Sequence, residues 1–376
     1  MFSRRSSRDQ SPNAVAATLG GRRPAFDLTS SNPTTAGLGY GESLLVVLER
    51  AQARSLVYAP EPFGLRSARE AVAAVTGVPA PDVVLSASTS EAYSFLFKLL
   101  CDPGDAVLVP APSYPLFEHL AELEAVQVQS YRLAYDGAWH VDLDSLRRAV
   151  TPRTRAIISV SPNNPTGQYL SASERLALES LGAPVIYDEV FAEFPFHGAA
   201  PAAPRSTDTL TFTLDGLSKR AGSPQLKLGW TLLSGSPRAR DEARQRLELI
   251  ADTFLSVGTP IQQALPELLA LCPAITQSIA ARCRSNWAAL VSALEGSPVS
   301  LLHAEAGWSA VLQLPRVQSE EQLVLGLLDA TDVLVQPGWF YDFESEPFAV
   351  VSLLTEPRVF REGIARLARY MSRVVA

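Results

Sequence analysis

Three short strings in this chain carry side chains with complementary chemistry. The string SPNNPTG contains Asn164 in a turn, YDEVF sets Asp188 at the end of an apolar run, and GLSK places Lys219 among small residues. A lysine amine can form a Schiff base with an aldehyde, a carboxylate can keep a pyridine nitrogen protonated, and an amide can donate a hydrogen bond to a ring oxygen. These groups are the ones needed to hold pyridoxal 5'-phosphate, so the sequence predicts a site for that cofactor.

Each of the three residues also has an ordinary interpretation. A lysine in a loop is usually a solvated surface charge, an aspartate after a strand can cap a helix or a turn, and Asn-Pro-Gly strings favour turns. The order of the strings favours the cofactor site, because Lys219 follows an apolar strand and lies downstream of Asn164 and Asp188.

In this order the three strings resemble the class I/II aminotransferases of the fold-type I pyridoxal-phosphate-dependent enzymes, from about Asp27 to the C-terminus. The resemblance implies an α/β fold, with a large domain built on a mostly parallel sheet covered by helices and a smaller α/β C-terminal domain. It also implies an activity that moves an amino group between an amino acid and a 2-oxo acid through a Schiff base on Lys219. Lys219 and Asp188 are then the catalytic residues, and the freed lysine amine moves the substrate proton.

The resemblance also implies a phosphate site at Ser88, Thr89 and Ser90, between a predicted strand and a predicted helix. The start of a helix attracts phosphate through free N–H groups and the helix dipole. These residues also make ordinary N-caps, and both roles can hold together. Ser218, beside the lysine, is a further expected cofactor contact.

Two tyrosines complete the expected cofactor contacts. By family position Tyr114 stacks on the pyridine face, although a plain core tyrosine is the alternative. Tyr58 matches a position whose hydroxyl reaches the phosphate of the neighbouring subunit, which implies a homodimer. The alternative interpretation is that Tyr58 is an ordinary surface residue with no role in the site.

The chain departs from the family at four places. Phe191 stands where many relatives have a tyrosine that binds the 3-oxygen, and Lys227 stands where an arginine usually clamps the phosphate. Ser31 replaces a glycine that lies near the substrate. The largest departure is that Phe348–Ser352 lacks the arginine that grips the substrate carboxylate, and Arg358 lies beyond the predicted strand.

A missing carboxylate clamp leaves three expectations open: a cation from elsewhere, backbone N–H groups near Ser31 with its hydroxyl, or a substrate without that carboxylate. The string WFY at 339–341 is a candidate wall for a larger substrate side chain, although core packing explains it nearly as well.

Other functions remain as alternatives. The same cofactor chemistry supports a β-lyase, a racemase or an oxidase, because the protein decides which bond breaks. A cofactor-binding regulatory or inactive relative is disfavoured, because about two dozen residues precede the predicted fold, too few for a DNA-binding domain.

The elements that must position these residues alternate along the chain. Short apolar strands at 83–85, 106–109, 156–160 and 185–187 alternate with helices, which indicates a mostly parallel, doubly covered sheet. We expect four parts: a disordered tail at 1–24, a segment at 25–43 that joins the small domain, the large cofactor-binding domain at 44–258, and the small domain at 259–376.

Composition excludes several classes of protein. The chain has 376 residues, a net charge of −7 and 47% hydrophobic residues, which fits two domains and gives no sign of a basic nucleic-acid-binding surface. The three cysteines and four histidines show no metal-ligand spacing, so we expect no metal. No apolar run approaches the roughly 20 residues of a membrane span, and the start lacks a signal core. We therefore expect no membrane partner and a cytoplasmic location.

Overall fold

The protein is described from a computed structural model that covers residues 2–7, 11–345 and 347–376. Its largest feature is an eight-stranded sheet in the order β2-β9-β8-β7-β6-β3-β4-β5. The five strands from β8 to β4 in this order pair in parallel, and β2, β9 and β5 pair antiparallel with their neighbours. The strands are β2 (Val83–Ser86), β3 (Ala106–Ala111), β4 (Gln127–Tyr135), β5 (Trp139–Val141), β6 (Thr154–Val160), β7 (Val185–Asp188), β8 (Thr211–Gly216) and β9 (Gly229–Ser234). The predicted mostly parallel sheet is confirmed.

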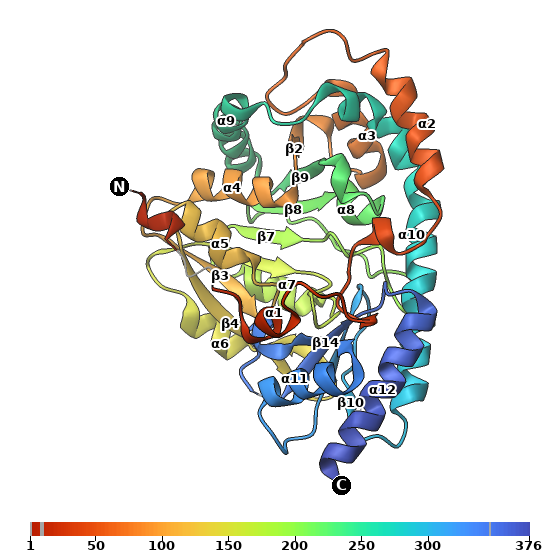
Figure 1. The fold of residues 1–376 in the computed structure, drawn as a ribbon. Coiled ribbons are helices and arrows are strands. Elements are labelled where there is room, and N and C mark those ends of the chain that lie inside the picture. The colour runs from red at the N-terminus through yellow and green to blue at the C-terminus, as the bar shows by residue number, and fades with distance from the viewer. Residues whose placement is uncertain (1, 8–10, 346) are drawn as a thin grey trace.

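Helices cover both faces of this sheet (Figure 1). Successive side chains of a strand point to opposite faces, so Ile158 packs in one core cluster and Ile157 in another. The first cluster lies under α4 (Thr89–Leu100), α5 (Leu116–Leu123) and α9 (Pro237–Phe254), and the second under α6 (Leu143–Ala149) and α7 (Ala172–Glu179). Burial on both faces explains why the central strands are continuously apolar.

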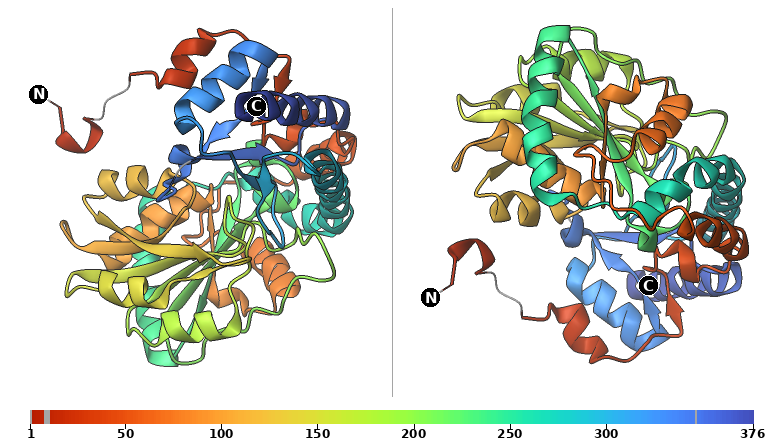
Figure 2. Two further views of the ribbon diagram at one scale, coloured as in Figure 1. Left: turned by 90° about the horizontal axis from the view of Figure 1, so that it is seen from below. Right: turned by 90° about the horizontal axis from the view of Figure 1, so that it is seen from above.

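A smaller antiparallel sheet forms near the C-terminus, in the order β10-β11-β14-β13. Its strands are β10 (Ser300–Leu301), β11 (Ser309–Gln313), β13 (Gln336–Pro337) and β14 (Phe348–Ser352), and α11 (Glu320–Thr331) and α12 (Pro357–Val375) accompany it. The N-terminal strand β1 (Phe26–Asp27) pairs in parallel with β12 (Val333–Leu334). Both views in Figure 2 place residues 14–27 beside this C-terminal unit.

One long helix, α10 (Thr259–Leu294), runs along the side of the molecule next to α12 (Figure 1). It also contacts α2 (Gly41–Gln52) and α3 (Arg66–Thr76). Of the described helices it alone is long and apolar enough to cross a membrane by length and composition, and half of that stretch is buried in the molecule. A core helix passes the same test, so this is weak support for a membrane role.

The predicted disordered tail differs from the structure in its described part. It contains the short helix α1 (Ala14–Leu19), which is capped by the Asn13 side chain at 2.9 Å from Ala16 N and contacts α11. A capping asparagine before an alanine-rich run and a left-handed Gly20 after it explain the helix. The remaining elements are α8 (Leu217–Arg220) and the 3-10 helices η1 (Arg4–Ser6), η2 (Pro33–Thr35), η3 (Ala80–Asp82), η4 (Pro224–Leu226) and η5 (Gly338–Tyr341).

Candidate active site

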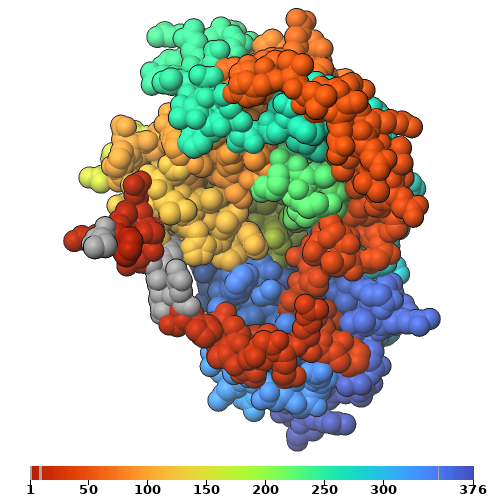
Figure 3. Space-filling view, turned by 45° about the horizontal axis from the view of Figure 1, so that its top comes forward, coloured from red at the N-terminus to blue at the C-terminus, as the bar shows by residue number. Residues whose placement is uncertain are grey.

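A cavity of about 500 Å³ opens where the carboxyl ends of the large sheet's parallel strands meet the smaller sheet. Figure 3 shows the surface hollowed between these two parts of the chain. The cavity brings together every predicted site residue except Tyr58: Ser31, Ser88, Thr89, Ser90, Tyr114, Asn164, Asp188, Ser218, Lys219 and Lys227. Segments far apart in sequence therefore converge on one site, although the role of each residue stays a prediction.

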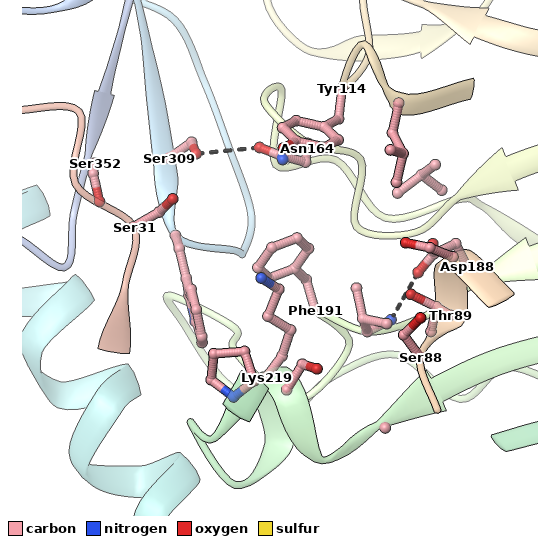
Figure 4. A pocket seen from close by; sticks show the side chains of 18 of the residues that line it. Ser31, Ser88, Thr89, Tyr114, Asn164, Asp188, Phe191, Lys219, Ser309 and Ser352 are labelled. Atoms are coloured by element: carbon pink, nitrogen blue, oxygen red, sulfur yellow. Dashed lines mark hydrogen bonds between the residues drawn. The ribbon is translucent and has the colours of Figure 1, made fainter. Parts of the chain in front are cut away.

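Lys219 lies on α8, directly after β8, and its side chain projects into the cavity (Figure 4). Its Nζ lies 5.3 Å from the ring centre of Phe191 and 5.1 Å from that of Trp308. Burial lowers the pKa of Lys219 from its ordinary value, and the negative charge of Asp188 opposes that shift. A larger fraction of Lys219 is therefore in the neutral, nucleophilic form than for a surface lysine.

The turn before Lys219 depends on a close approach of two strands. Gly216 ends β8 and pairs with Gly229, which begins β9. A Cβ on Gly216 would lie 2.8 Å from the Cα of Gly229 and 2.9 Å from the carbonyl oxygen of Leu228. Glycine at 216 thus lets the backbone of β9 approach the loop that carries the lysine.

Asp188 ends β7 with its side chain almost fully buried. Tyr93 Oη donates a hydrogen bond of 2.9 Å to Asp188 Oδ2, and Val190 N donates one of 3.3 Å to Oδ1. Burial raises the pKa of Asp188 to about 6, and the Tyr93 and Val190 hydrogen bonds and the Lys219 charge oppose that rise. A cationic partner in the cavity would complete the charge balance.

The sequence analysis missed Tyr93. It is fully buried on α4, four residues after Thr89, and it lines the same cavity. That spacing puts both residues on one helix face, and this is the signal that could have found it. The tyrosine is the direct hydrogen-bond partner of the predicted catalytic acid.

Asn164 is oriented by the smaller sheet. Ser309 Oγ, on β11, donates a hydrogen bond of 3.2 Å to Asn164 Oδ1 (Figure 4). The Asn164 amide nitrogen remains to donate to a ligand. The neighbouring Asn163 is buried and holds the turn, because its Nδ2 donates to Pro112 O and to Thr166 Oγ1, both at 3.0 Å. Ser309 was also missed, because nothing in the sequence ties β11 to this turn.

The phosphate-binding prediction falls on the start of α4. Ser88 is its N-cap and accepts a hydrogen bond from Glu91 N at 3.2 Å, while Thr89 and Ser90 form the first turn. The uncapped N–H groups and the dipole of this helix give the cavity an anion-attracting end. Lys227, in the left-handed region with a φ of 51°, also lines the cavity.

Tyr114 and Tyr58 are both exposed. Tyr114 lines the cavity with 46% of its surface accessible, so the alternative interpretation of Tyr114 as a core residue is wrong. Tyr58 is 79% exposed and lines a different, shallow pocket of its own chain. The structure therefore gives Tyr58 no role in the cavity of its own chain.

The substrate clamp missing from the sequence is also missing from the cavity. Val350 and Val351 on β14 are buried and line it. Arg358 belongs to α12, outside the strand, and among the described residues no arginine lines the cavity. Of the predicted aromatic wall, Phe340 and Tyr341 line the cavity and Trp339 does not.

Comparison with known proteins agrees with this geometry. The family model described as aminotransferase class I and II matches residues 26–352. The chain belongs to the class I and II aminotransferases. Glutamate-pyruvate aminotransferase AlaA of Escherichia coli is 27% identical over 92% of this chain and 90% of its own length. Human tyrosine aminotransferase is 31% identical over 57% of this chain and 50% of its own length.

Solved structures of this aminotransferase family share the fold. Alanine aminotransferase from Pyrococcus furiosus has a TM-score of 0.85 at 22% identity, with 94% of this chain and 93% of that chain covered. Aspartate aminotransferase from Thermus thermophilus with maleate has a TM-score of 0.83 at 22% identity, covering 98% and 99%. At this identity the structural likeness establishes the fold-type I architecture alone.

Proposed function

We propose that this protein is a pyridoxal-phosphate-dependent aminotransferase in which Lys219 binds the cofactor covalently, and which moves an amino group between an amino acid and a 2-oxo acid. The observation that carries the proposal is that a half-buried lysine and a buried carboxylate line one cavity. Family membership supports the reaction class, and the named relatives support an amino acid and a 2-oxo acid as substrates.

The side chains in the cavity fit the cofactor. Asp188 is buried, and among the described residues it forms no ion pair, so a protonated pyridine nitrogen would find its counter-ion there. The start of α4, with Thr89 and Ser90, suits the phosphate, and Asn164 suits the ring oxygen. When bound, pyridoxal 5'-phosphate supplies an aldehyde that captures an amine and a ring that takes up electron density.

The chain's own residues then perform three tasks. Lys219 Nζ, shielded by Phe191 and Trp308, is placed to move the proton of the substrate Cα. Asp188, when ionised, would hold the nitrogen of a bound pyridine ring in its protonated form. Tyr114 covers the cavity from its rim and excludes water from the reacting atoms.

A homodimer belongs to this proposal. Leu56, Val57 and Tyr58 form an exposed run, with accessible fractions of 88%, 74% and 79%. Three consecutive exposed apolar side chains are unusual on a free surface and suit an interface between two copies of the chain. In such a dimer Tyr58 would reach the phosphate site of the neighbouring subunit.

A cytoplasmic location and the domain division at 43/44 and 258/259 are retained as proposals.

Borohydride reduction of the protein with pyridoxal 5'-phosphate tests the proposal. The chain has only three lysines, Lys98, Lys219 and Lys227, so peptide mapping gives a clear answer. We expect the label on Lys219, and a loss of several orders of magnitude in amino transfer for Lys219→Ala. Lys98→Ala is the matched control, because Lys98 lies on α4 paired with Glu124 and does not line the cavity. A label on Lys98 or Lys227, or full activity of Lys219→Ala, contradicts the proposal.

A further inference from the structure

The two ends of the cavity differ in charge. Among the described residues that line it, the charged side chains are Asp188, Lys219 and Lys227. Asp188 and Lys219 come from the large sheet, and Lys227 lies two residues before Gly229, whose Cβ position is 3.3 Å from Thr89 N. All three charges therefore lie on the side of the large sheet and of the α4 N-terminus.

The opposite end is built from uncharged side chains. Figure 4 shows Ser31 and Ser352 beside each other and Ser309 next to Asn164, all across the cavity from Asp188. Val350 and Val351 supply methyl groups at the same end. This end comes from the N-terminal segment and from β11 and β14 of the smaller sheet.

This end of the cavity offers both hydrogen-bond donors and a hydrogen-bond acceptor. Ser352 Oγ accepts a hydrogen bond from Leu354 N at 3.3 Å, so its hydroxyl proton is free to donate. Ser309 gives its proton to Asn164, so its oxygen is free to accept. In the described part of the chain the buried Trp308 Nε1 has no hydrogen-bond partner, and Trp308 lines the cavity.

A free carboxylate is poorly matched to this environment. A carboxylate only accepts hydrogen bonds, and burying its charge without a cation is costly. An amide or a hydroxyl both donates and accepts, so it can use Ser352 and Ser309 together at no charge penalty. The neighbouring Phe340, Tyr341 and Trp308 offer apolar surface for the rest of the ligand.

We propose that the preferred substrate is an amine whose reacting carbon carries an uncharged amide or hydroxymethyl group in place of a carboxylate, next to an apolar or aromatic side chain. The inference rests on the proposed aminotransferase function and narrows its amino-acid substrate to an amide or amino-alcohol analogue of an amino acid. Amino transfer would exchange the C–N and C–H bonds of the substrate carbon for a C=O bond whose oxygen comes from water, and Lys219 would accept the proton. The bound cofactor would hold the nitrogen and two electrons until a second carbonyl compound takes up both and a water molecule is released.

Ligand binding without reaction provides the first test. The probes are 3-phenylpropanamide and 3-phenylpropanoate, which differ only in the terminal group and lack the amine. Calorimetric titration of the cofactor-loaded protein should give at least tenfold tighter binding of the amide. Equal affinities, or tighter binding of the propanoate, would overturn the inference.

Val350→Arg should reverse the preference, because it introduces a cation at the uncharged end. We expect the affinity for 3-phenylpropanoate to rise at least tenfold, whereas Val350→Leu, which adds bulk without charge, should give no such rise. Melting temperatures establish that both variants fold. If Val350→Arg does not fold, Ser309→Ala replaces it. It removes the acceptor oxygen that an amide N–H can use and a carboxylate cannot, so it should weaken amide binding about fivefold and leave propanoate binding unchanged. An equal loss for both probes contradicts the inference.

A reactive series separates this inference from the proposed function. Phenylalanine, phenylalaninamide and phenylalaninol share one side chain, and reaction with each bleaches the yellow colour of the loaded enzyme. Faster bleaching by the amide or the alcohol than by phenylalanine supports the inference. Faster bleaching by phenylalanine overturns it and leaves the aminotransferase function standing. If neither this series nor the common amino acids bleach the colour, the proposed function itself fails.

Discussion

At the scale of single residues, the state of Asp188 decides what the cavity can do. Tyr93 donates to one of its oxygens, and a hydrogen bond to an ionised carboxylate favours the ionised form. Tyr93→Phe keeps the ring and removes that donor. We expect the pKa of Asp188 to rise, the affinity for pyridoxal phosphate to fall about tenfold, and the acidic limb of the pH–rate profile to move to higher pH.

Tyr131→Phe is the matched control for Tyr93→Phe. Tyr131 is equally buried, and its hydroxyl donates a hydrogen bond of 2.9 Å to Ile158 O, away from the cavity. Its loss should cost about 1 kcal/mol of folding stability and leave the cofactor affinity and the pH profile unchanged. Equal changes in cofactor affinity for the two variants would mean that Tyr93 acts only through packing.

The raised pKa of Asp188 also makes a prediction about stability. With a folded pKa of about 6 against an ordinary value of 3.8, the folded protein disfavours the ionised form. The free energy of unfolding of the cofactor-free protein should therefore decrease as the pH rises from about 4 through 6. Asn at 188 does not ionise, so Asp188→Asn should be more stable by roughly 2–3 kcal/mol at pH 7.5 and by almost nothing at pH 3.5.

Urea denaturation of the cofactor-free variants at the two pH values measures this difference. With the cofactor present the order should reverse, because a protonated ring nitrogen would stabilise the ionised Asp188 and not the amide. A stability difference that does not depend on pH would show that Asp188 does not titrate in this range.

At the scale of elements, the pairing of β8 with β9 positions the lysine-bearing helix. Gly216→Ala places a methyl group 2.8 Å from Gly229 Cα, so the strands must separate. We expect a loss of about 1–3 kcal/mol in folding stability, as for an overpacked core, together with weaker cofactor binding. Gly41→Ala is the control, because nothing lies within 4 Å of a Cβ at the start of α2. Calorimetric melting should show Gly41→Ala unchanged or slightly more stable.

At the scale of the whole molecule, the loop between α2 and α3 (orange in Figure 3) carries the exposed run from Leu56 to Tyr58. If this run lies in a dimer interface, Leu56→Glu should bury an unpaired charge and dissociate the dimer. Sedimentation velocity should then show a monomer with weaker cofactor retention, because Tyr58 no longer reaches its neighbour. Leu176→Glu, at a similarly exposed position on α7, should remain dimeric. A wild-type protein that sediments as an active monomer contradicts the dimer.

The sequence alone determined the fold class and the three motif residues, because each of them depends on local patterns. Continuous apolar strands such as 156–160 predict burial on both faces, and the turn, strand-end and loop strings locate Asn164, Asp188 and Lys219. The resemblance to the aminotransferases implies an arginine within Phe348–Ser352, and its absence there can be seen from the string.

Only the tertiary structure decided which residues complete the site. Tyr93 meets Asp188 across 95 residues of sequence, and Ser309 meets Asn164 across 145. Such pairs depend on how the smaller sheet and α4 dock against the strand ends, and no local pattern encodes that docking. The uncharged end of the cavity arises in the same way, because Ser31 and Ser352 become neighbours only when the N-terminal segment pairs with the C-terminal unit, where Ser352 N donates to Leu28 O.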